Sequence, residues 1–231
     1  MNARIADAIN LSWLLAARLQ GWAAKGMLDA YEAERQPITE QVSQFAMNHA
    51  QQMIKMKRAV PQNIEEDSPA GDALRFDVGQ GAYDLNVQQF CCAGLNFGYF
   101  YAGSPIIAHE AEPPPAYSMG GFTPSTVPGC RAPHFWLDDG RSLYDAFGPG
   151  YTLLRFDATA DVSALVAAAK ARKMPLAVLD LPPVDLPAGY LHQLVLCRAD
   201  QHVVWRGDSL PAAPHPLVAR LCGEGVLHGA A

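Results

Sequence analysis

The first part of the chain repeats apolar side chains at helical spacing. Residues 2 to about 20 therefore predict a helix with a wide buried face, ended by the turn that Gly21 and Gly26 bracket. A helix this apolar needs neighbours on every side, and no element precedes it in this sequence. We expect its outer face to be covered by a body that the chain does not supply. Its two adjoining apolar stripes are Ile5, Ile9, Trp13, Ala16 and Leu19, and then Ala8, Leu11 and Leu15.

Helical spacing continues through a second region. We predict a helix over residues 27–36, after which Pro37 either kinks it or starts a new helix, because proline lacks the amide donor and clashes with the preceding turn. Apolar positions then keep helical spacing to about Arg58. The polar residues 61–73 suit an exposed loop, residues 74–92 suit another helix, and the aromatic and proline-rich residues 95–128 suit an extended connector with short strands.

After Pro128 the pattern changes to short strands that alternate with helices. Asp161 is a candidate N-cap, with Val162, Leu165, Val166 and Ala169 facing inward from the helix that follows it. This order predicts a compact α/β domain with a mixed sheet. The expected strands cover residues 133–137, 151–156, 175–181, 191–198 and 202–207, and the expected helices begin at 142, 161 and 216.

Composition narrows the function classes. The chain has 231 residues, 50% of them hydrophobic, so it can bury a substantial core. Only 17% are charged and the net charge is -6, which disfavours nucleic acid and anionic membrane surfaces as partners. Residues 85–109 lack acidic and basic side chains, yet their amides, glycines and proline argue against a membrane span, and the N-terminus does not read as a signal peptide. We expect a soluble, cytoplasmic protein.

Several kinds of catalytic site are disfavoured by spacing. The five cysteines are odd in number and form neither a disulfide framework nor a Cys-x-x-Cys pair, so dithiol exchange is unexpected and a reducing compartment suits them. Adjacent Cys91 and Cys92 favour ordinary burial, and Cys130 and Cys197 favour core or loop positions. The seven histidines follow no metal-ligand pattern, so we expect no metal, and His202 fits a polar position in the sheet. The dinucleotide turn G-x-G-x-x-G does not occur.

The two ends of the chain resemble one family, the FAD-dependent aromatic hydroxylases related to phenol, resorcinol and hydroxyphenylpropionate hydroxylases. In that family a glycine-rich turn ending in Gly-Met-Asn opens a helix whose N-terminus faces the flavin ring. Met1 and Asn2 match the end of that turn, so the resemblance makes them cofactor-binding candidates that would act mainly through backbone amides. The remaining matches are Ile5, Asp7, Ala8, Asn10 and Leu11 in the helix, and Tyr31, Glu32, Arg35 and Pro37 in the next.

The second half of the resemblance lies in PGCRAPHFWLDDGRSLYDAFGPGYTLLRF and LVLCRADQHVVWRG, which are similar to the thioredoxin-like C-terminal domain of the same enzymes. It implies incomplete FAD-domain helices over residues 1–60, a helix and extended connector over 61–128, and a thioredoxin-like domain without Cys-x-x-Cys over 129–231. Asp7, Tyr31, Glu32 and Arg35 then resemble a polar set that joins two flavin-domain helices. Glu32 and Arg35 have the spacing of a helical ion pair.

The resemblance implies the C-terminal part of an FAD- and NAD(P)H-dependent monooxygenase that hydroxylates phenolic compounds. Because the FAD cradle is missing from the sequence, we expect the isolated chain to be inactive, with its catalytic residues unidentified. An alternative is a non-catalytic interaction module that forms a homodimer or docks on a separate flavin-binding half. A third reading is a truncated gene or a misplaced start, which the upstream nucleotide sequence would settle.

Overall fold

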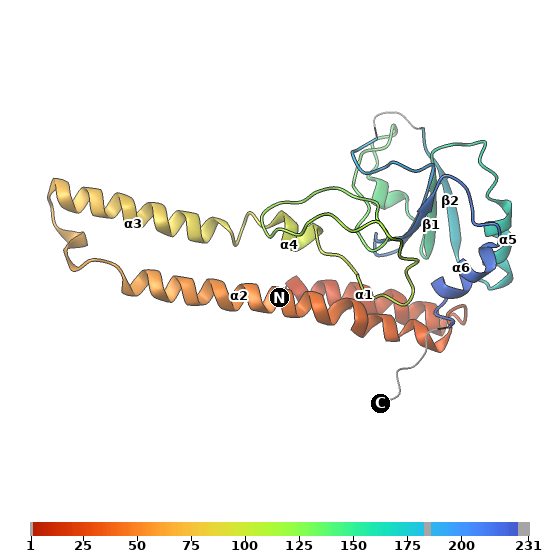
Figure 1. The fold of residues 1–231 in the computed structure, drawn as a ribbon, viewed down its shortest axis with the longest axis horizontal. Helices are drawn as coiled ribbons and strands as arrows, with labels where there is room; N and C mark the ends of the chain where they lie inside the picture. The colour runs from red at the N-terminus through yellow and green to blue at the C-terminus, as the bar shows by residue number, and fades with distance from the viewer. Residues whose placement is uncertain (1, 183–185, 226–231) are drawn as a thin grey trace.

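The computed structural model describes residues 2–182 and 186–225. Figure 1 shows a sheet domain at one end, with α1 and the first half of α2 beside it, and a long arm made by the rest of α2 and by α3. The helical part comprises α1 (Asn2–Leu19), η1 (Lys25–Met27), α2 (Asp29–Arg58), η2 (Gln62–Glu65), α3 (Pro69–Val87) and α4 (Ala93–Phe97). The sheet part comprises η3 (Leu143–Ala146), β1 (Tyr151–Arg155), α5 (Ser163–Ala171), β2 (Leu176–Asp180), β3 (Leu194–Arg198), β4 (Val203–Gly207) and α6 (Pro214–Leu221).

The four strands form one mixed sheet in the order β2-β1-β3-β4. β1 and β2 are parallel and are joined through α5, whereas β3 pairs antiparallel with both β1 and β4. Gln201, in the tight turn between β3 and β4, has a positive φ of 73°. The predicted class, α/β with an N-terminal helical segment and a mixed-sheet domain, is confirmed.

The core lies on both faces of the sheet. One face carries Leu154, Val195 and Cys197 and packs against Leu143 and Tyr190. The other face packs against α5, α6 and the N-terminal helices, so α1 and the start of α2 share a hydrophobic core with the sheet. The Tyr151 ring in β1 meets Trp13 and Trp22 edge-on, and its hydroxyl donates to the carbonyl of Leu221 over 2.8 Å.

The predicted first helix is present, but its inward face is narrower than the periodicity suggested. Asn10, Leu14 and Ala17 point inward and are 1% exposed or less. Ile5 and Ile9 are 56% and 54% exposed, and Leu19 is 87% exposed. Within the described residues, therefore, the outer apolar stripe of α1 remains uncovered.

Of the two alternatives for Pro37, the start of a new helix is wrong, because α2 runs through the proline as one helix of 30 residues. Ala30, Glu34 and Ile38 are buried at four-residue spacing on either side of the proline. Burial on both sides outweighs the lost hydrogen bond and holds the helix continuous.

The expected exposed loop over residues 61–73 is also partly wrong. It contains η2, and α3 already begins at Pro69. The Ser68 hydroxyl caps this helix by accepting from the amide of Gly71 over 3.1 Å, and a proline in the first turn is well tolerated. Polar residues are typical of exposed loops, but in residues 61–73 they include Ser68, the N-cap of α3.

The connector over 95–128 contains no strand within the described chain, so the expectation of short strands there is wrong. Single backbone bonds tie it to the sheet domain instead, from the amide of Tyr101 to Gly129 over 3.1 Å and from Ala108 to Val204 over 2.9 Å. Arg206 in β4 fixes its later part by donating to Glu110, Glu112 and Thr126. These backbone bonds and the Arg206 contacts anchor the segment without a regular ladder.

In the sheet domain, residues 133–137 make only an isolated bridge, between Trp136 and Ser142, and not the predicted strand. The helix expected at Ser142 is a short 3-10 turn, η3, capped by the Ser142 hydroxyl. On α5, Val166 is 38% exposed, and Ala168 faces inward in its place. No helix in the described chain combines the length and apolar character needed to cross a bilayer.

Candidate functional site

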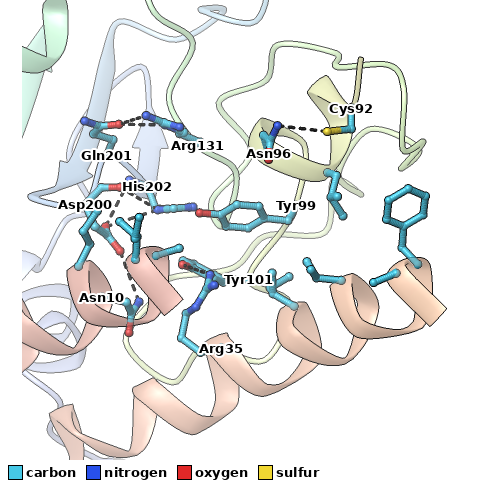
Figure 2. A pocket seen from close by; sticks show the side chains of 18 of the residues that line it. Asn10, Arg35, Cys92, Asn96, Tyr99, Tyr101, Arg131, Asp200, Gln201 and His202 are labelled. Atoms are coloured by element: carbon cyan, nitrogen blue, oxygen red, sulfur yellow. Dashed lines mark hydrogen bonds and ion pairs between the residues drawn. The ribbon is translucent and has the colours of Figure 1, made fainter. Parts of the chain in front are cut away.

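A cavity of about 1030 Å³ opens where the helices meet the sheet domain. Its walls come from α1, from α2, from the segment 89–101 and from the turn between β3 and β4 (Figure 2). The helices contribute apolar side chains, and the segment and turn contribute aromatic and polar ones. The apolar helical lining includes Ile5, Ile9, Ile38, Val42 and Phe45.

A buried ion cluster stands behind one wall. Arg198, at the end of β3, donates to Glu34 of α2 over 2.5 and 2.9 Å and to Asp200 over 2.9 and 2.6 Å. The side chains of Arg198 and Glu34 are 0% exposed and that of Asp200 is 4% exposed. Removing one member would leave an uncompensated buried charge, so the cluster locks the turn onto α2.

Neighbouring side chains complete the hydrogen bonding of this cluster. Asn10 of α1 donates to Glu34 over 2.7 Å, and the Ser104 hydroxyl donates to the other Glu34 oxygen over 2.5 Å. The Arg198 guanidinium also lies over the rings of Trp13 and Tyr101, at 4.9 and 5.3 Å. α1, α2, the connector and the sheet therefore meet at one arginine.

The polar set suggested by the sequence is brought together only in part. Arg35 donates to Asp7 over 2.9 Å and to the Tyr101 hydroxyl over 3.2 Å, which joins α2 to α1 and to the connector. Glu32 is exposed and makes no ion pair with Arg35 in the described structure. Sequence reasoning missed Glu34, although its four-residue spacing from Ala30 and Ile38 was a readable signal.

His202 was expected to be an ordinary polar position of the sheet, but it belongs to the cavity wall. Its ring lies 4.3 Å from that of Tyr101 and 5.4 Å from that of Tyr99. Its Nδ1 is 3.0 Å from the carbonyl of Asp200. In Figure 2, Arg131 lies next to Gln201, Tyr99 lies next to His202, and Tyr101 lies next to Arg35.

Burial and charge pairing set the protonation of this wall. Burial by itself would raise the pKa of Asp200, but Arg198 and His202 outweigh it and the pKa lies well below the usual range. Burial raises the pKa of Tyr101 above its ordinary value, so this phenol is a neutral hydroxyl. At this wall Asp200 is therefore a fixed negative charge paired with Arg198, and Tyr101 is a neutral hydroxyl.

Burial disfavours the thiolate form of three of the five cysteines. Burial raises the pKa of Cys130 and of Cys222 to about 11, and it also raises that of Cys197. Cys130 and Cys197 are buried as expected, whereas Cys91 is exposed and only its neighbour Cys92 is buried. Within the described residues no group of histidine, cysteine and acidic side chains could hold a metal ion.

The start of α1 is where the sequence resemblance offered two cofactor-binding candidates, Met1 and Asn2. Met1 lies outside the described residues, and Asn2 is the first residue of α1. The first turn holds no acidic side chain, so no carboxylate offsets the partial positive charge of this helix end there. Ile5 and Ala6 place this end beside the cavity. The sequence supplies no glycine-rich cradle for the dinucleotide.

A helical segment followed by a mixed-sheet domain is the arrangement that the resemblance to flavoprotein aromatic hydroxylases implies, and comparison with known proteins agrees with it. A model of the FAD binding domain matches residues 1–46, and a model of the aromatic-ring hydroxylase C-terminal region matches residues 125–224. The chain belongs to this family of FAD-dependent monooxygenases and corresponds to the C-terminal part of its members.

Individual relatives are monooxygenases, in agreement with the family models. The chain is 34% identical to the FAD-dependent monooxygenase apdD of Emericella nidulans, over 91% of this chain and 35% of that protein. It is 30% identical to a phenol 2-monooxygenase of a Pseudomonas species, over 92% of this chain and 40% of that protein. The chain thus spans less than half the length of these relatives.

Solved structures show the same arrangement. RebC soaked with chromopyrrolic acid, with bound 7-carboxy-K252c, superposes with a TM-score of 0.86 at 37% identity, over 96% of this chain and 42% of that one. The flavin-dependent monooxygenase PieE, in complex with FAD and substrate, superposes with a TM-score of 0.79 at 26% identity, over 96% and 44%. The high coverage of this chain means that the arm and the sheet domain are both matched.

Proposed function

We propose that the chain is the C-terminal part of an FAD- and NAD(P)H-dependent monooxygenase that hydroxylates phenolic aromatic compounds, and that it is inactive by itself. The observation that supports this most directly is the start of α1, whose first turn holds no acidic side chain and which lies next to a large cavity. Met1 and Asn2 remain the proposed contacts to the flavin. A phenol hydroxylase among the relatives supports the substrate class.

Bound FAD would supply the redox chemistry, and the part of the chain near it would supply position and charge. The amides at the start of α1 would stabilise negative charge on the nearby edge of the flavin. The Arg198 cluster would keep that helix start in place by holding α1 and α2 against the sheet. The free cysteines support a reducing compartment, and we propose the cytoplasm.

The test measures flavin retention and activity, first in the isolated chain and then together with a flavin-binding polypeptide. The purified chain should be colourless after incubation with FAD and should show no NADPH oxidation stimulated by phenol. The flavin-binding part of the Pseudomonas phenol 2-monooxygenase, supplied as a separate polypeptide, should restore flavin retention and phenol-dependent NADPH oxidation. A yellow isolated chain with stoichiometric FAD would overturn the proposed inactivity, and a mixture that retains no flavin would count against the proposed function.

A second candidate is a non-catalytic module that docks on a separate flavin-binding partner or on another copy. The uncovered apolar stripe of α1 favours it, because exposed apolar surface of this kind tends to recruit a partner. Ile9→Glu should abolish association with the flavin-binding polypeptide, and Leu191→Glu, at a residue 76% exposed in the sheet domain, serves as the matched control. A strictly monomeric chain without affinity for that polypeptide would contradict docking.

A further inference from the structure

The two edges of the sheet differ in what covers them. The edge at β4 is paired by neighbouring chain, because the amide of Ala108 donates to Val204 over 2.9 Å and that of Gly129 donates to Val203 over 2.8 Å. β2 forms the other edge and pairs with β1 alone among the described residues. It lies beside α5, at the end of the molecule opposite the arm (Figure 1). One edge is therefore closed and the other is open.

The ladder between β1 and β2 shows which backbone groups of β2 face outward. The carbonyl of Pro175 accepts from the amide of Tyr151, and the amide of Leu181 donates to the carbonyl of Arg155, each over 2.9 Å. Backbone groups alternate in direction along a strand, so the odd-numbered residues from 175 to 181 face β1 and residues 176, 178 and 180 face outward. No described segment pairs with this outer side. Three residues thus offer amides and carbonyls to a further strand.

The outward positions carry few of the features that protect edge strands. They hold Leu176, Val178 and Asp180, so neither proline nor lysine is among them. No bulge interrupts the pairing of β2 with β1, and Val178 is 36% exposed. Proteins block edges of this kind with charges, prolines or bulges because an open edge pairs with other strands. Only the charge of Asp180, at the end of the strand, restricts what can be added here.

The chain that leads into β2 is basic. Lys170 lies in the last turn of α5 and Lys173 lies in the turn before β2. Both are exposed and make no ion pair with a described residue. Arg172 between them pairs with Glu224. Three cations and one carboxylate leave the start of β2 with an excess of positive charge.

The opposite end of β2 is acidic. Asp180 forms an ion pair with Arg155 over 2.5 Å. The hydrogen bond to Asp180, together with the charges of Asp180, Asp157 and Asp161, raises the pKa of the Arg155 guanidinium above its ordinary value. Three carboxylates around one cation leave an excess of negative charge. A strand that runs antiparallel to β2 begins at this acidic end and finishes at the basic one, so the charges favour a segment that begins basic and finishes acidic.

We propose that β2 binds an extended segment of another protein, which adds to the four-stranded sheet as an antiparallel fifth strand. The segment carries a basic residue beside Asp180, apolar residues beside Val178 and Leu176, and an acidic residue beside Lys173. Main-chain hydrogen bonds supply the affinity, and antiparallel pairing is slightly more stable per residue than parallel pairing. The site uses no flavin, so it is independent of the proposed monooxygenase function.

The test uses the unmodified chain and a synthetic peptide, acetylated and amidated, of the sequence Lys-Thr-Val-Thr-Val-Thr-Glu. In the proposed register its lysine and two valines face Asp180, Val178 and Leu176, and their amides donate to β2, whereas the threonine amides face away. Isothermal titration calorimetry should show saturable binding of one peptide per chain. Methylation of both valine nitrogens should weaken binding about tenfold or more, because two hydrogen bonds are lost.

The matched control is the isomeric peptide that carries its two methyl groups on the first two threonine nitrogens, which should bind as the parent does. Equal affinity of the two methylated isomers, or no saturation with the parent peptide, overturns the proposal. A peptide with lysine and glutamate exchanged should bind more weakly than the parent. If it binds equally well, the charges do not set the direction and the antiparallel assignment is wrong.

Variants locate the site on β2. Val178→Pro removes an outward amide but no bond to β1, and proline is tolerated at such edge positions, so the variant should fold and bind the peptide about tenfold more weakly. Val178→Thr keeps the amide and a β-branched side chain, and it should bind as the unmodified chain does. Unchanged affinity in folded Val178→Pro overturns the assignment to β2.

Two further measurements test the charge and the occupant. Lys173→Glu should weaken binding of the parent peptide, whereas Lys57→Glu, at an exposed lysine of the arm, should not. Equal effects of the two changes overturn the proposed contact at Lys173. Analytical ultracentrifugation should show the unmodified chain without pairing through β2. A dimer that Val178→Pro dissociates would overturn the proposal, because a second copy would then occupy the edge.

Discussion

The two ends of α2 are stabilised in different ways. Near its start, Ala30, Glu34, Arg35 and Ile38 are buried against α1, the connector and the sheet. Past His49 the helix buries no further residue, and α3 beside it buries only Gly71 (Figure 1). The first region is held by tertiary contacts that include paired charges, and the arm is held mainly by helix propensity, capping and modest contact between its two helices.

This difference indicates where a substitution should lower the stability of the protein. In the buried region each side chain has partners on several elements, so its loss is felt throughout the domain. On the outer surface of the arm, Met47, Ile54, Phe76 and Tyr83 are between 50% and 71% exposed and contribute little to the isolated chain. The variants below compare these two regions.

The largest effect is expected from Arg198→Met. It leaves Glu34 and Asp200 buried without their cation, a change that costs about 3–5 kcal/mol in comparable cases. Urea unfolding followed by circular dichroism measures it. The matched variant in the arm is Arg75→Met, which breaks an exposed pair with Asp72 and should cost less than about 1 kcal/mol. Similar losses in both variants would erase the proposed difference between the regions.

Apolar truncation should give a smaller contrast of the same sign. Leu14→Ala removes a side chain that is 0% exposed in the shared core, and we expect a loss of about 2–5 kcal/mol. Met47→Ala, at a residue 57% exposed on α2, should stay within about 0.5 kcal/mol. Thermal unfolding of the two variants at one protein concentration provides the measurement. A large loss of stability in Met47→Ala would mean that another protein surface covers the arm in solution.

The sequence allowed the helices and strands to be predicted, but not the contacts that join the helical part to the sheet domain. Helical periodicity located α1, α2 and α5, and short apolar runs located the four strands of the sheet, because local pattern reflects local burial. The Glu34 to Arg198 contact joins residues 164 positions apart, and charged residues are normally assigned to the surface, so no local rule pairs them. The cavity, whose walls come from α1, α2, the segment 89–101 and the turn between β3 and β4, was beyond prediction for the same reason.

Acid should affect the buried region before the arm. The pKa of Asp200 is lowered in the folded state, so its stabilising contribution is complete above the unfolded pKa of about 4 and is lost as pH falls below it. The slope for one proton is at most about 1.4 kcal/mol per pH unit. Unfolding free energies measured from pH 6 to pH 3 should fall less steeply in Asp200→Asn. Asp139→Asn, at an exposed residue, is the control, and an equal change in slope there would deny Asp200 a special role.

The smallest expected effect tests the arm from the opposite direction. Gly79 and Gly81 lie inside α3, and a Cβ added at either position meets nothing within 4 Å. Each change to alanine should therefore stabilise the helix by about 0.5–1 kcal/mol, since alanine has the higher helix propensity. Hydrogen exchange of the α3 amides measures this directly. Gly71→Ala is the control, because its Cβ would lie 2.1 Å from the carbonyl oxygen of Glu66, so it should destabilise the same helix. If alanine at 79 or 81 lowers the protection of the α3 amides, a partner contacts that side of α3 in solution. The arm would then be less exposed than the isolated chain indicates.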